Sequence, residues 1–492
     1  MAMLLAQALG IQPDEGRPEV VAFTGAGGKS SALFRLTTEL QAAGRRVVTT
    51  TTTRMAETQI RQAPAVVSAP AGELPEEALR RALDAHGQVL LIGRETIEQG
   101  PVHKRAGVAP HVVDRLAACA ADLGLGAILV EADGSHMLPA KAPAEHEPVV
   151  PASTTLLVPV LGLDSVGQPL AAGRLHRPEI MRRLLNLPDD DSARLTPEQA
   201  ARLLLHPAGG DKGRVQGTRR IFLLNKADTS PRRAVGRLMA DALTASGAES
   251  MLTHLQTEGD YPVNSRHGPV AAVILAAGES ARMGRPKQLL TLAGVPLVVR
   301  AVETALAGGA DWVAVVLGAY QAEVTAALAD YGLLHTERVD IVHNPRWPSG
   351  QASSVAAGLA HIVRRGSPSG SSPDLPLTES AGEFPWEFTR MEGTTRAAVF
   401  LPVDQPFAPA WLLRGLIRLW EGGAGLAAPR ANGELRGAPA LFDRAYWPEL
   451  IKLTGDVGGR GLLRRHADLV ASITLDAERL RDWDCPDDVV VL

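Results

Sequence analysis

The second half of the chain contains a glycine-rich loop with two basic residues, a combination suited to holding a triphosphate. The loop reads LAAGESARMGRPK and directly follows an apolar stretch. Gly278 and Gly284 would let the backbone approach phosphate oxygens closely, so that its amides can face them. Arg282 and Lys287 add fixed positive charge, and Lys287 is suited to neutralise charge that develops at an α-phosphate. A tight turn with two solvated cations is the alternative interpretation.

Acidic residues later in the same half could hold a magnesium ion. The apolar run AAVFLPVDQP leads to Asp404, and DWDCPDD offers Asp482 and Asp484. Mg²⁺ prefers one or two carboxylates together with phosphate oxygens and water. We therefore predict Asp404 as a metal ligand and catalytic residue, with Asp482 as the second metal ligand and Asp484 as its rival. A helix N-cap is the alternative role for Asp404.

The first half contains a second glycine loop, which reads TGAGGKSS. It matches a shortened phosphate-binding loop of the form G-x-x-G-K-S, which lacks two residues of the usual G-x-x-x-x-G-K-[ST] pattern. Gly25 and Gly28 would shape the turn. Lys29 could reach phosphates, and Ser30 could hold magnesium. The alternative interpretation of this stretch is a glycine turn before a helix, without a ligand.

A possible guanine-reading motif lies farther along, where RIFLLNKAD ends in Asn225, Lys226 and Asp228. In the N-K-x-D signature the aspartate accepts hydrogen bonds from the guanine base, and a buried site of this kind rejects adenine. We predict GTP or ATP as the nucleotide of this half, with Glu131 and Asp133 available to a magnesium ion. A surface helix cap is the alternative for the motif.

The composition excludes several other classes of site. A net charge of -4 argues against a nucleic-acid partner, and two cysteines are too few for a disulfide framework or a cysteine-rich zinc site. Scattered histidines are more often surface or structural residues than metal ligands. The histidines considered for this reason are His136, His146, His176 and His206.

The elements that must position these residues alternate between short apolar strands and helical patterns. Strands are expected at Val20 to Phe23 and Val270 to Leu275, each followed by its glycine loop. This alternation predicts an α/β fold of two doubly wound domains. We place a nucleotide-binding domain at 1–264 and a second domain at 270–492, with a loop insert at about 364–395 that is rich in Ser, Pro and Gly.

The chain shows no signal for export or membrane insertion. Its N-terminus lacks a basic region followed by a continuous apolar stretch, and no run approaches the roughly 18–20 apolar residues that span a bilayer. A cytoplasmic protein without a membrane partner is the expectation.

The second half resembles molybdenum cofactor cytidylyltransferases. Five stretches occur in the order of that family: LAAGESARMGRPKQLL, HNPRWPSGQASSVAAGL, LPVDQP, GAPALFDRAYWPELIKLTGDVGGRGLL and DWDCPDD. The resemblance covers nearly all of 270–492 and implies a Rossmann-like nucleotidyltransferase fold. It also implies transfer of CMP from CTP, with Mg²⁺, to a molybdopterin-type substrate. Related guanylyltransferases carry Ala-Gly-Gly in the loop, whereas this chain carries the cytidylyl version.

The same resemblance implies roles for individual residues. Arg282 and Lys287 correspond to triphosphate ligands, Asp404 to the principal metal ligand and Asp482 to the second. Part of the acceptor wall is implied by LTGDVGGRG, with Gly455, Asp456 and Gly458. The nucleotide-binding residues implied are Leu275, Ala276, Ala277, Gly278, Gly284, Asn344, Ser353 and Ser354.

The first half resembles a family of accessory proteins for selenium-dependent hydroxylases, the YqeC-like family. The stretches VVAFTGAGGKSS, VVTTTTTRM, LVEADGSHMLPAKAP and FLLNKAD carry this resemblance over most of 18–230. It implies a P-loop-like nucleotide-binding domain that serves molybdenum hydroxylases, so an apo molybdenum hydroxylase becomes a candidate partner. A transferase for a sugar or alditol phosphate, and a chaperone that inserts finished cofactor, are the alternative functions.

Overall fold

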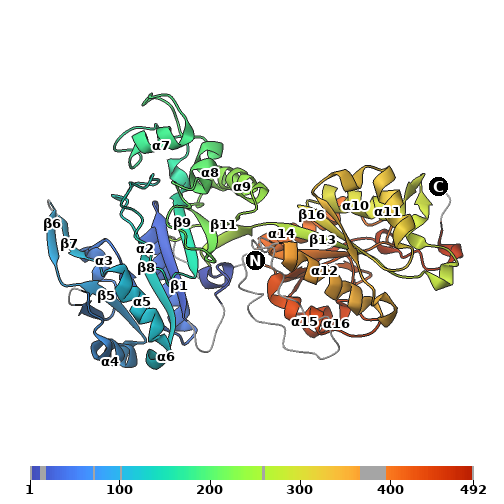
Figure 1. The fold of residues 1–492 in the computed structure, drawn as a ribbon, viewed down its shortest axis with the longest axis horizontal. Helices are drawn as coiled ribbons and strands as arrows, with labels where there is room; N and C mark the ends of the chain where they lie inside the picture. The colour runs from blue at the N-terminus through green and yellow to red at the C-terminus, as the bar shows by residue number, and fades with distance from the viewer. Residues whose placement is uncertain are drawn as a thin grey trace. The chain divides into compact units, whose positions relative to one another are not determined.

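The computed structural model describes residues 3–11, 18–69, 72–99, 102–256, 261–365 and 395–489. Two compact units divide the chain, the first ending at His267 and the second beginning at Gly268 (Figure 1). The loop insert predicted at about 364–395 falls largely on 366–394, which lies outside the described ranges.

The first unit is built on a sheet that has nine strands in the described residues, in the order β12-β11-β10-β9-β1-β8-β2-β5-β4. All neighbouring pairs are parallel except β11 with β12, which is antiparallel. The strands are β1 (Glu19–Gly25), β2 (Arg46–Thr51), β4 (Val66–Ala69), β5 (Gln88–Gly93), β8 (Leu125–Glu131), β9 (Leu156–Gly162), β10 (Arg219–Asn225), β11 (Glu249–Thr253) and β12 (Val263–His267). A small separate sheet comprises β3 (Arg54–Ala56), β6 (Thr96–Gln99) and β7 (Val102–Ala106).

Helices cover both faces of this sheet because its central strands are apolar on both sides. Val21 and Phe23 of β1 pack with the helices α1 and α2, whereas Val20 packs on the opposite face with α4, α5 and α6. A third cluster joins α7, α8 and α9 to β9, β10 and β11. The helices are α1 (Leu5–Ala8), α2 (Lys29–Ala42), α3 (Glu57–Ile60), α4 (Glu76–His86), α5 (Pro110–Ala118), α6 (Ala120–Leu123), α7 (Pro178–Leu185), α8 (Pro197–Leu205) and α9 (Ser230–Ala245).

The second unit contains a mixed sheet with the order β17-β16-β13-β18-β21-β19-β20, and β22 also pairs with β19. The first four strands are parallel, while β21 runs antiparallel to both β18 and β19. The strands are β13 (Val270–Ala276), β16 (Trp312–Leu317), β17 (Val339–His343), β18 (Ala397–Pro402), β19 (Leu426–Ala431), β20 (Glu434–Leu435), β21 (Ala440–Asp443) and β22 (Val470–Thr474). A two-stranded ribbon is formed by β14 (Thr291–Leu292) and β15 (Val295–Pro296).

Two hydrophobic cores flank this second sheet. In Figure 1, α10 and α11 lie on one side of β13 and β16, while α12, α15 and α16 lie on the other. Ala272 and Ile274 of β13 belong to the core under α10, and Ala271 and Val273 belong to the core under α12. The helices are α10 (Leu297–Ala307), α11 (Gln321–Asp330), α12 (Gln351–Arg365), α14 (Ala410–Glu421), α15 (Trp447–Ile451) and α16 (Arg460–Arg465).

These sheets confirm the predicted α/β class. In each unit the glycine loop leaves the carboxyl end of a central parallel strand, β1 or β13. Neighbouring parallel strands end at the same edge, so the residues that follow them are brought together there. Within the described part of the chain, no helix combines the length and apolar character needed to cross a bilayer.

Candidate functional site

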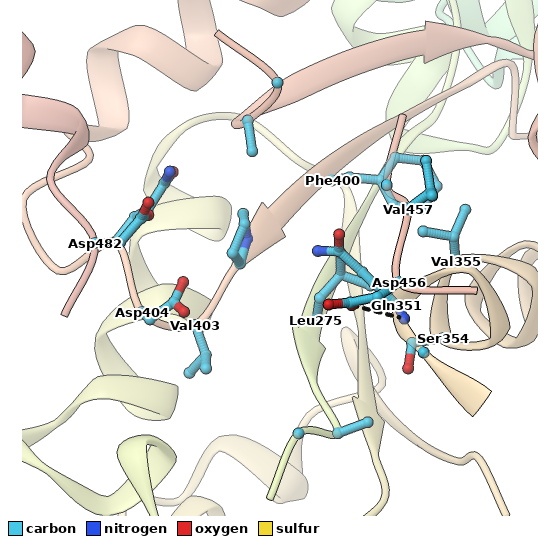
Figure 2. Close-up of a pocket in the computed structure, with 18 of the residues that line it drawn as sticks. Leu275, Gln351, Ser354, Val355, Phe400, Val403, Asp404, Asp456, Val457 and Asp482 are labelled. Carbon is cyan, nitrogen blue, oxygen red and sulfur yellow. Dashed lines mark hydrogen bonds between the residues drawn. The ribbon is translucent and has the colours of Figure 1, made fainter. Parts of the chain in front are cut away.

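A cavity of about 990 Å³ opens in the second unit at the carboxyl ends of β13 and β18. The two strands are parallel neighbours, with Leu275 opposite Pro402, so the glycine loop and Asp404 leave the sheet at the same edge. In Figure 2, Asp404 and Asp482 lie on one side of the cavity, and Gln351, Ser354 and Asp456 on the other. The predicted residues that line it are Leu275, Ala277, Gly278, Arg282, Lys287, Ser354, Asp404, Asp456, Gly458, Asp482 and Asp484.

Lys287 lies between two carboxylates on the wall of this cavity. Its Nζ donates to Asp484 Oδ1 at 2.5 Å and to Asp404 Oδ2 at 3.3 Å. Arg282 lies farther out, with Nη1 at 3.7 Å from Asp484 Oδ2. Burial acts to lower the pKa of Lys287, but the hydrogen bond to Asp484 and the charge of Asp404 outweigh burial and raise that pKa. Lys287 is therefore charged at neutral pH.

The carboxylates of this cluster carry more negative charge than Lys287 neutralises. Burial raises the pKa of Asp404, and the charge of Asp484 adds to the rise while Lys287 opposes it. Burial also raises the pKa of Asp482, and the charge of Asp404 adds to it, against a hydrogen bond from Gln405. A further cation at these side chains would relieve their repulsion. The direct carboxylate neighbours of Lys287 are Asp404 and Asp484, rather than Asp482.

A buried glutamine fixes the shape of the glycine loop. Gln288 Nε2 donates to the carbonyl oxygens of Ala276 and Gly278, each at 2.8 Å. A Cβ atom on Gly278 would meet no atom within 4 Å, so this residue faces open space in the cavity. Gly284 has a φ of +66°, which explains its residue type, but neither it nor Ala276 belongs to the lining. Ala276 is buried beneath the loop.

Asn344 supports the opposite wall from outside the lining. Its Nδ2 donates to Ser353 Oγ at 2.9 Å and to Ser354 Oγ at 3.1 Å, while its Oδ1 accepts from the Arg346 amide at 3.0 Å. Asn344 is buried, and of these three polar side chains only Ser354 reaches the cavity. The structure therefore places Asn344 and Ser353 behind the wall, where they hold the start of α12.

In the first unit the lysine of the glycine loop is buried in an ion-pair cluster. Lys29 Nζ donates to the carbonyl oxygen of Gly25 at 2.7 Å and lies 3.2 Å from Asp133 Oδ1 and 3.8 Å from Glu131 Oε1. The Gly25 amide donates to Asp133 Oδ2 at 3.0 Å. The Lys29 side chain is only 2% exposed. Its charge is therefore largely compensated inside the protein.

Ser30 sits beside this cluster in a short polar chain. Its Oγ donates to Glu131 Oε2 at 2.8 Å and accepts from Gln59 Nε2 at 2.6 Å. Burial raises the pKa of Glu131, although Lys29 and Ser30 oppose the rise. The hydroxyl and the carboxylate thus lie together at the carboxyl ends of β1 and β8, which are parallel neighbours.

The three predicted residues of the N-K-x-D stretch separate in the structure. Asn225 is buried: its Nδ2 donates to the Gly27 carbonyl at 2.8 Å, and its Oδ1 accepts from Thr253 Oγ1 and the Leu255 amide. Lys226 donates to Asp164 at 2.7 Å. Asp228 is exposed and pairs with Arg232 of α9 at 2.8 Å. Asn225 thus holds the glycine loop, whereas Asp228 lies on the surface.

Replacing Asn225 with alanine is expected to destabilise the first unit by about 2–4 kcal/mol, because it leaves the Gly27 carbonyl and the Leu255 amide without their side-chain partner. The matched control is Asp228→Ala, which removes only a surface ion pair and should cost less than about 1 kcal/mol. Far-UV circular dichroism during urea unfolding measures both variants. Equal stability of the two would contradict the structural role of Asn225.

A second ion-pair group lies next to Lys29 and involves Lys141, Glu147 and Arg177. Glu147 accepts from Lys141 at 2.7 Å and from Arg177 at 2.6 Å, and Lys141 also lies 3.0 Å from Asp133. Burial acts to raise the pKa of Glu147, but the hydrogen bonds from Arg177 and Lys141 outweigh it and lower that pKa to about 2. Sequence reasoning missed this group, although Lys141 stands in the quoted stretch LVEADGSHMLPAKAP.

The depressed pKa of Glu147 predicts a loss of stability in acid. Between its ordinary pKa of 4.5 and the folded value of about 2, the unfolded chain binds the proton that the folded chain excludes. Stability from this group is therefore complete above pH 4.5 and disappears as the pH falls towards 2. Glu147→Gln should lower stability at pH 7 and flatten the decline of the unfolding free energy across this range. An unchanged slope would contradict the assignment.

The histidines do not form a metal centre in the described residues, which contain no group of three or more His, Cys, Asp or Glu arranged to hold an ion. His136 and His176 stack with ring centroids 4.7 Å apart. Burial lowers the pKa of His176 to about 4, and the charges of Arg177 and Lys141 add to the effect. His176 is therefore neutral at pH 7.

Comparison with known families assigns each half of the chain separately. The family described as YqeC protein matches residues 21–179, and the family described as MobA-like NTP transferase domain matches residues 272–470. The uncharacterised protein YqeC of Escherichia coli (strain K12) is 34% identical over 213 residues, which cover 43% of this chain and 77% of that relative.

Two further relatives match shorter stretches. The bifunctional protein GlmU of Halorhodospira halophila is 49% identical over 96 residues, which cover 19% of each chain. Nicotine blue oxidoreductase of Paenarthrobacter nicotinovorans is 46% identical over 92 residues, or 18% of this chain and 42% of that relative. The matched stretch of the present chain thus covers less than half the length of either relative.

Solved structures with partial similarity include Rv0371c from Mycobacterium tuberculosis H37Rv, with a TM-score of 0.34 and 25% identity, covering 45% of this chain and 95% of that one. A nucleotidyl transferase from Methanothermobacter thermautotroptrophicus has a TM-score of 0.33 and 20% identity, with 45% and 94% covered.

The family match at residues 272–470 gives the second unit a nucleotidyl-transfer role, of the transferase class that moves a nucleotidyl group from a nucleoside triphosphate. The match at residues 21–179 and the similarity to the Escherichia coli protein YqeC assign the first unit to the YqeC family. The chain belongs to the YqeC family through its N-terminal half and carries a MobA-like NTP transferase domain in its C-terminal half.

Proposed function

We propose that the second unit transfers CMP from CTP to the terminal phosphate of a molybdopterin-type cofactor and releases pyrophosphate. The observation that carries this proposal is the position of Lys287. Its ammonium lies between Asp404 and Asp484 on the wall of a cavity large enough for a nucleotide and part of an acceptor. The order of sequence motifs in this half supports CTP and the molybdopterin-type acceptor.

The residues of this cavity fit a magnesium ion. Partial desolvation and the charge of Asp484 raise the pKa of Asp404, and partial desolvation and the charge of Asp404 raise the pKa of Asp482. Two such carboxylates, completed by phosphate oxygens and water, form the donor set that Mg²⁺ prefers. Asp404 would be the principal ligand, with Asp482 as the second and Asp484 as its rival. When bound, the ion would neutralise charge on the triphosphate.

The reaction joins two anions, and the residues of the chain reduce their repulsion. An acceptor phosphate oxygen attacks the α-phosphorus of CTP, a new P–O bond forms, the bridging α–β P–O bond breaks, and pyrophosphate leaves with the bond electrons. The acceptor phosphate is already an anion at neutral pH, so no side chain has to remove a proton. Lys287 stabilises charge near the α-phosphate, and Arg282 meets the leaving pyrophosphate.

The glycine loop is the part of the site that would select the nucleotide. Leu275, Ala277 and Gly278 line the cavity, and Gln288 fixes the loop backbone through the carbonyls of Ala276 and Gly278. A fixed backbone presents its hydrogen-bonding groups in one arrangement, so it favours one base over others. The sequence of the loop supports cytosine.

The acceptor would enter from the side of α12. There Gly350, with a φ of +110°, packs so closely on Gly455 that a Cβ atom would lie 2.3 Å from the Gly455 carbonyl carbon. The amide of Ala352 donates to the Gly455 carbonyl at 3.1 Å. These contacts hold Asp456 at the lining, where Figure 2 shows it across the cavity from Asp404, and Gly458 also lines the cavity.

The proposal is tested by incubating the full chain with Mg²⁺, one of CTP, GTP or ATP, and one acceptor, while pyrophosphate release and product mass are followed. The acceptors are the molybdenum-bearing molybdopterin, a sugar 1-phosphate and an alditol phosphate. We expect the cytosine dinucleotide, with at least about tenfold preference for CTP. Turnover only with a sugar or alditol phosphate would overturn the acceptor. Tight retention of finished cofactor without any turnover would instead indicate a chaperone that delivers it to a molybdenum hydroxylase.

A further inference from the structure

The first unit contains a cavity of about 770 Å³ that the proposed transfer reaction does not use. Its walls come from the glycine loop and the start of α2, from the small sheet at β3 and β7, and from the segment that follows β8. Among the described residues its lining includes five basic and two acidic side chains. They are Lys29, Arg54, Lys104, Arg177 and Lys226, with Glu131 and Glu147.

The two acidic side chains are already neutralised within the protein. Glu131 lies 3.8 Å from Lys29, and Glu147 accepts hydrogen bonds from Arg177 and from Lys141 behind the wall. The pKa of Glu147 is held at about 2, so its charge is strongly stabilised by these contacts. The remaining charge of the cavity is therefore positive, and an anion is the ligand that it would attract.

Lys104 is the basic lining residue whose charge is available to a ligand. Lys29, Arg177 and Lys226 each pair with a carboxylate, and Arg54 also interacts with another group of the protein. For the half-buried Lys104 side chain, by contrast, no hydrogen-bond or ion-pair partner is found in the part of the chain that the structure describes. Lys104 lines the cavity from β7.

The glycine loop at this cavity is held in a fixed conformation by close packing. Gly25, Gly27 and Gly28 have φ values of +85°, +86° and +144°. A Cβ atom on Gly28 would lie 2.2 Å from Asn225 Nδ2, so the loop is packed into this conformation. Gly27 and Gly28 line the cavity where α2, a helix of 14 residues, begins without a side-chain cap.

We propose that this cavity binds a phosphate-bearing small molecule, with its phosphate at the start of α2 and its charge met by Lys104. Asp228 takes no part, because it is exposed, pairs with Arg232 and is absent from the lining. The site therefore selects polyphosphate rather than guanine. The proposal does not depend on the reaction of the second unit.

Isothermal titration calorimetry of the full chain tests this site with three probes: inorganic tripolyphosphate, ATP and GTP, each with Mg²⁺. All proteins carry Lys287→Gln, so that the second unit contributes a reduced and constant background. Lys104→Glu is compared with Arg115→Glu, an equal charge reversal on the exposed surface of α5, and with Asp228→Asn. Thermal unfolding verifies that each variant is folded.

We expect Lys104→Glu to weaken tripolyphosphate binding by about tenfold or more, since an attractive charge is replaced by a repulsive one. Arg115→Glu and Asp228→Asn should remain within about twofold of their parent, and ATP and GTP should bind equally. If ATP and GTP bind more tightly than tripolyphosphate, the natural ligand is a nucleotide. If tripolyphosphate binds more tightly than both, the natural ligand is a phosphate compound without a nucleoside. Equal affinities of Lys104→Glu and Arg115→Glu would overturn the proposal. A strong GTP preference that Asp228→Asn removes would also overturn it.

Discussion

Replacing Asp404 with asparagine is expected to lower kcat for nucleotidyl transfer by about 10²–10³ while the protein stays folded. Asparagine keeps the shape of the side chain but removes the negative charge that faces Lys287 and that would hold a metal ion. Burial already raises the pKa of Asp404, so loss of its charge should be tolerated by the fold. The rate of pyrophosphate release at saturating CTP and acceptor measures the effect.

The matched control for this variant is Asp468→Asn, which alters an exposed carboxylate in the same unit outside the cavity. Its rate should stay within about twofold of the parent, because surface charges contribute little. If Asp404→Asn reacted as fast as Asp468→Asn, Asp404 would not be the metal-binding carboxylate of the reaction.

Replacing Lys287 with glutamine is expected to lower kcat/KM by about 10²–10³, which is the second large effect. The raised pKa of Lys287 keeps it protonated through neutral pH, so the parent should not lose activity through this group between about pH 6 and pH 8. Lys452→Gln, an exposed change in the same unit, serves as the control. Rates near those of the parent at pH 7 would remove Lys287 from the mechanism.

The two variants should not act independently. Lys287 and Asp404 are in direct contact at 3.3 Å, so the double variant is expected to lose much less than the product of the two single losses. Multiplicative losses would mean that the two side chains serve separate steps.

The sequence predicted most accurately the strands that precede the two glycine loops, because apolar runs and glycine turns mark their bounds. Strands expected at Val20 to Phe23 and Val270 to Leu275 are found as β1 (Glu19–Gly25) and β13 (Val270–Ala276). A buried parallel strand is apolar along its whole length, and the residues after it must lie at the carboxyl edge of the sheet. The pattern therefore places Asp404 at the same edge of the sheet as the glycine loop, while the pairing of β13 with β18 comes from the structure.

Side-chain contacts across the chain were less accessible to sequence reasoning. DWDCPDD does not reveal whether Asp482 or Asp484 meets Lys287, because the direction of each carboxylate depends on how the segment turns. In the structure Asp484 makes the contact. Likewise, the motif around Asn225 suggests a base reader, but burial and three local hydrogen bonds tie this side chain to the glycine loop.

The phosphate-loop interpretation of the first unit shows the same limit. The sequence predicts a lysine that reaches for a ligand, whereas the structure buries Lys29 against Asp133 and Glu131. Asp133 is separated from Lys29 by more than a hundred residues and meets it only because β1 and β8 are neighbours. The proposed role of Lys104 in binding phosphate depends on the small sheet of β3, β6 and β7, and no local sequence motif predicts how these strands pair.

The most direct test of the transferase account is a crystal structure of the full chain with a non-hydrolysable CTP analogue and Mn²⁺, recorded with anomalous scattering at the manganese edge. The account predicts a manganese peak at coordination distance from an Asp404 oxygen, with the triphosphate beside it and Lys287 Nζ within hydrogen-bond distance of a phosphate oxygen. A nucleotide bound in another cavity, or manganese held without any contribution from Asp404, would contradict it.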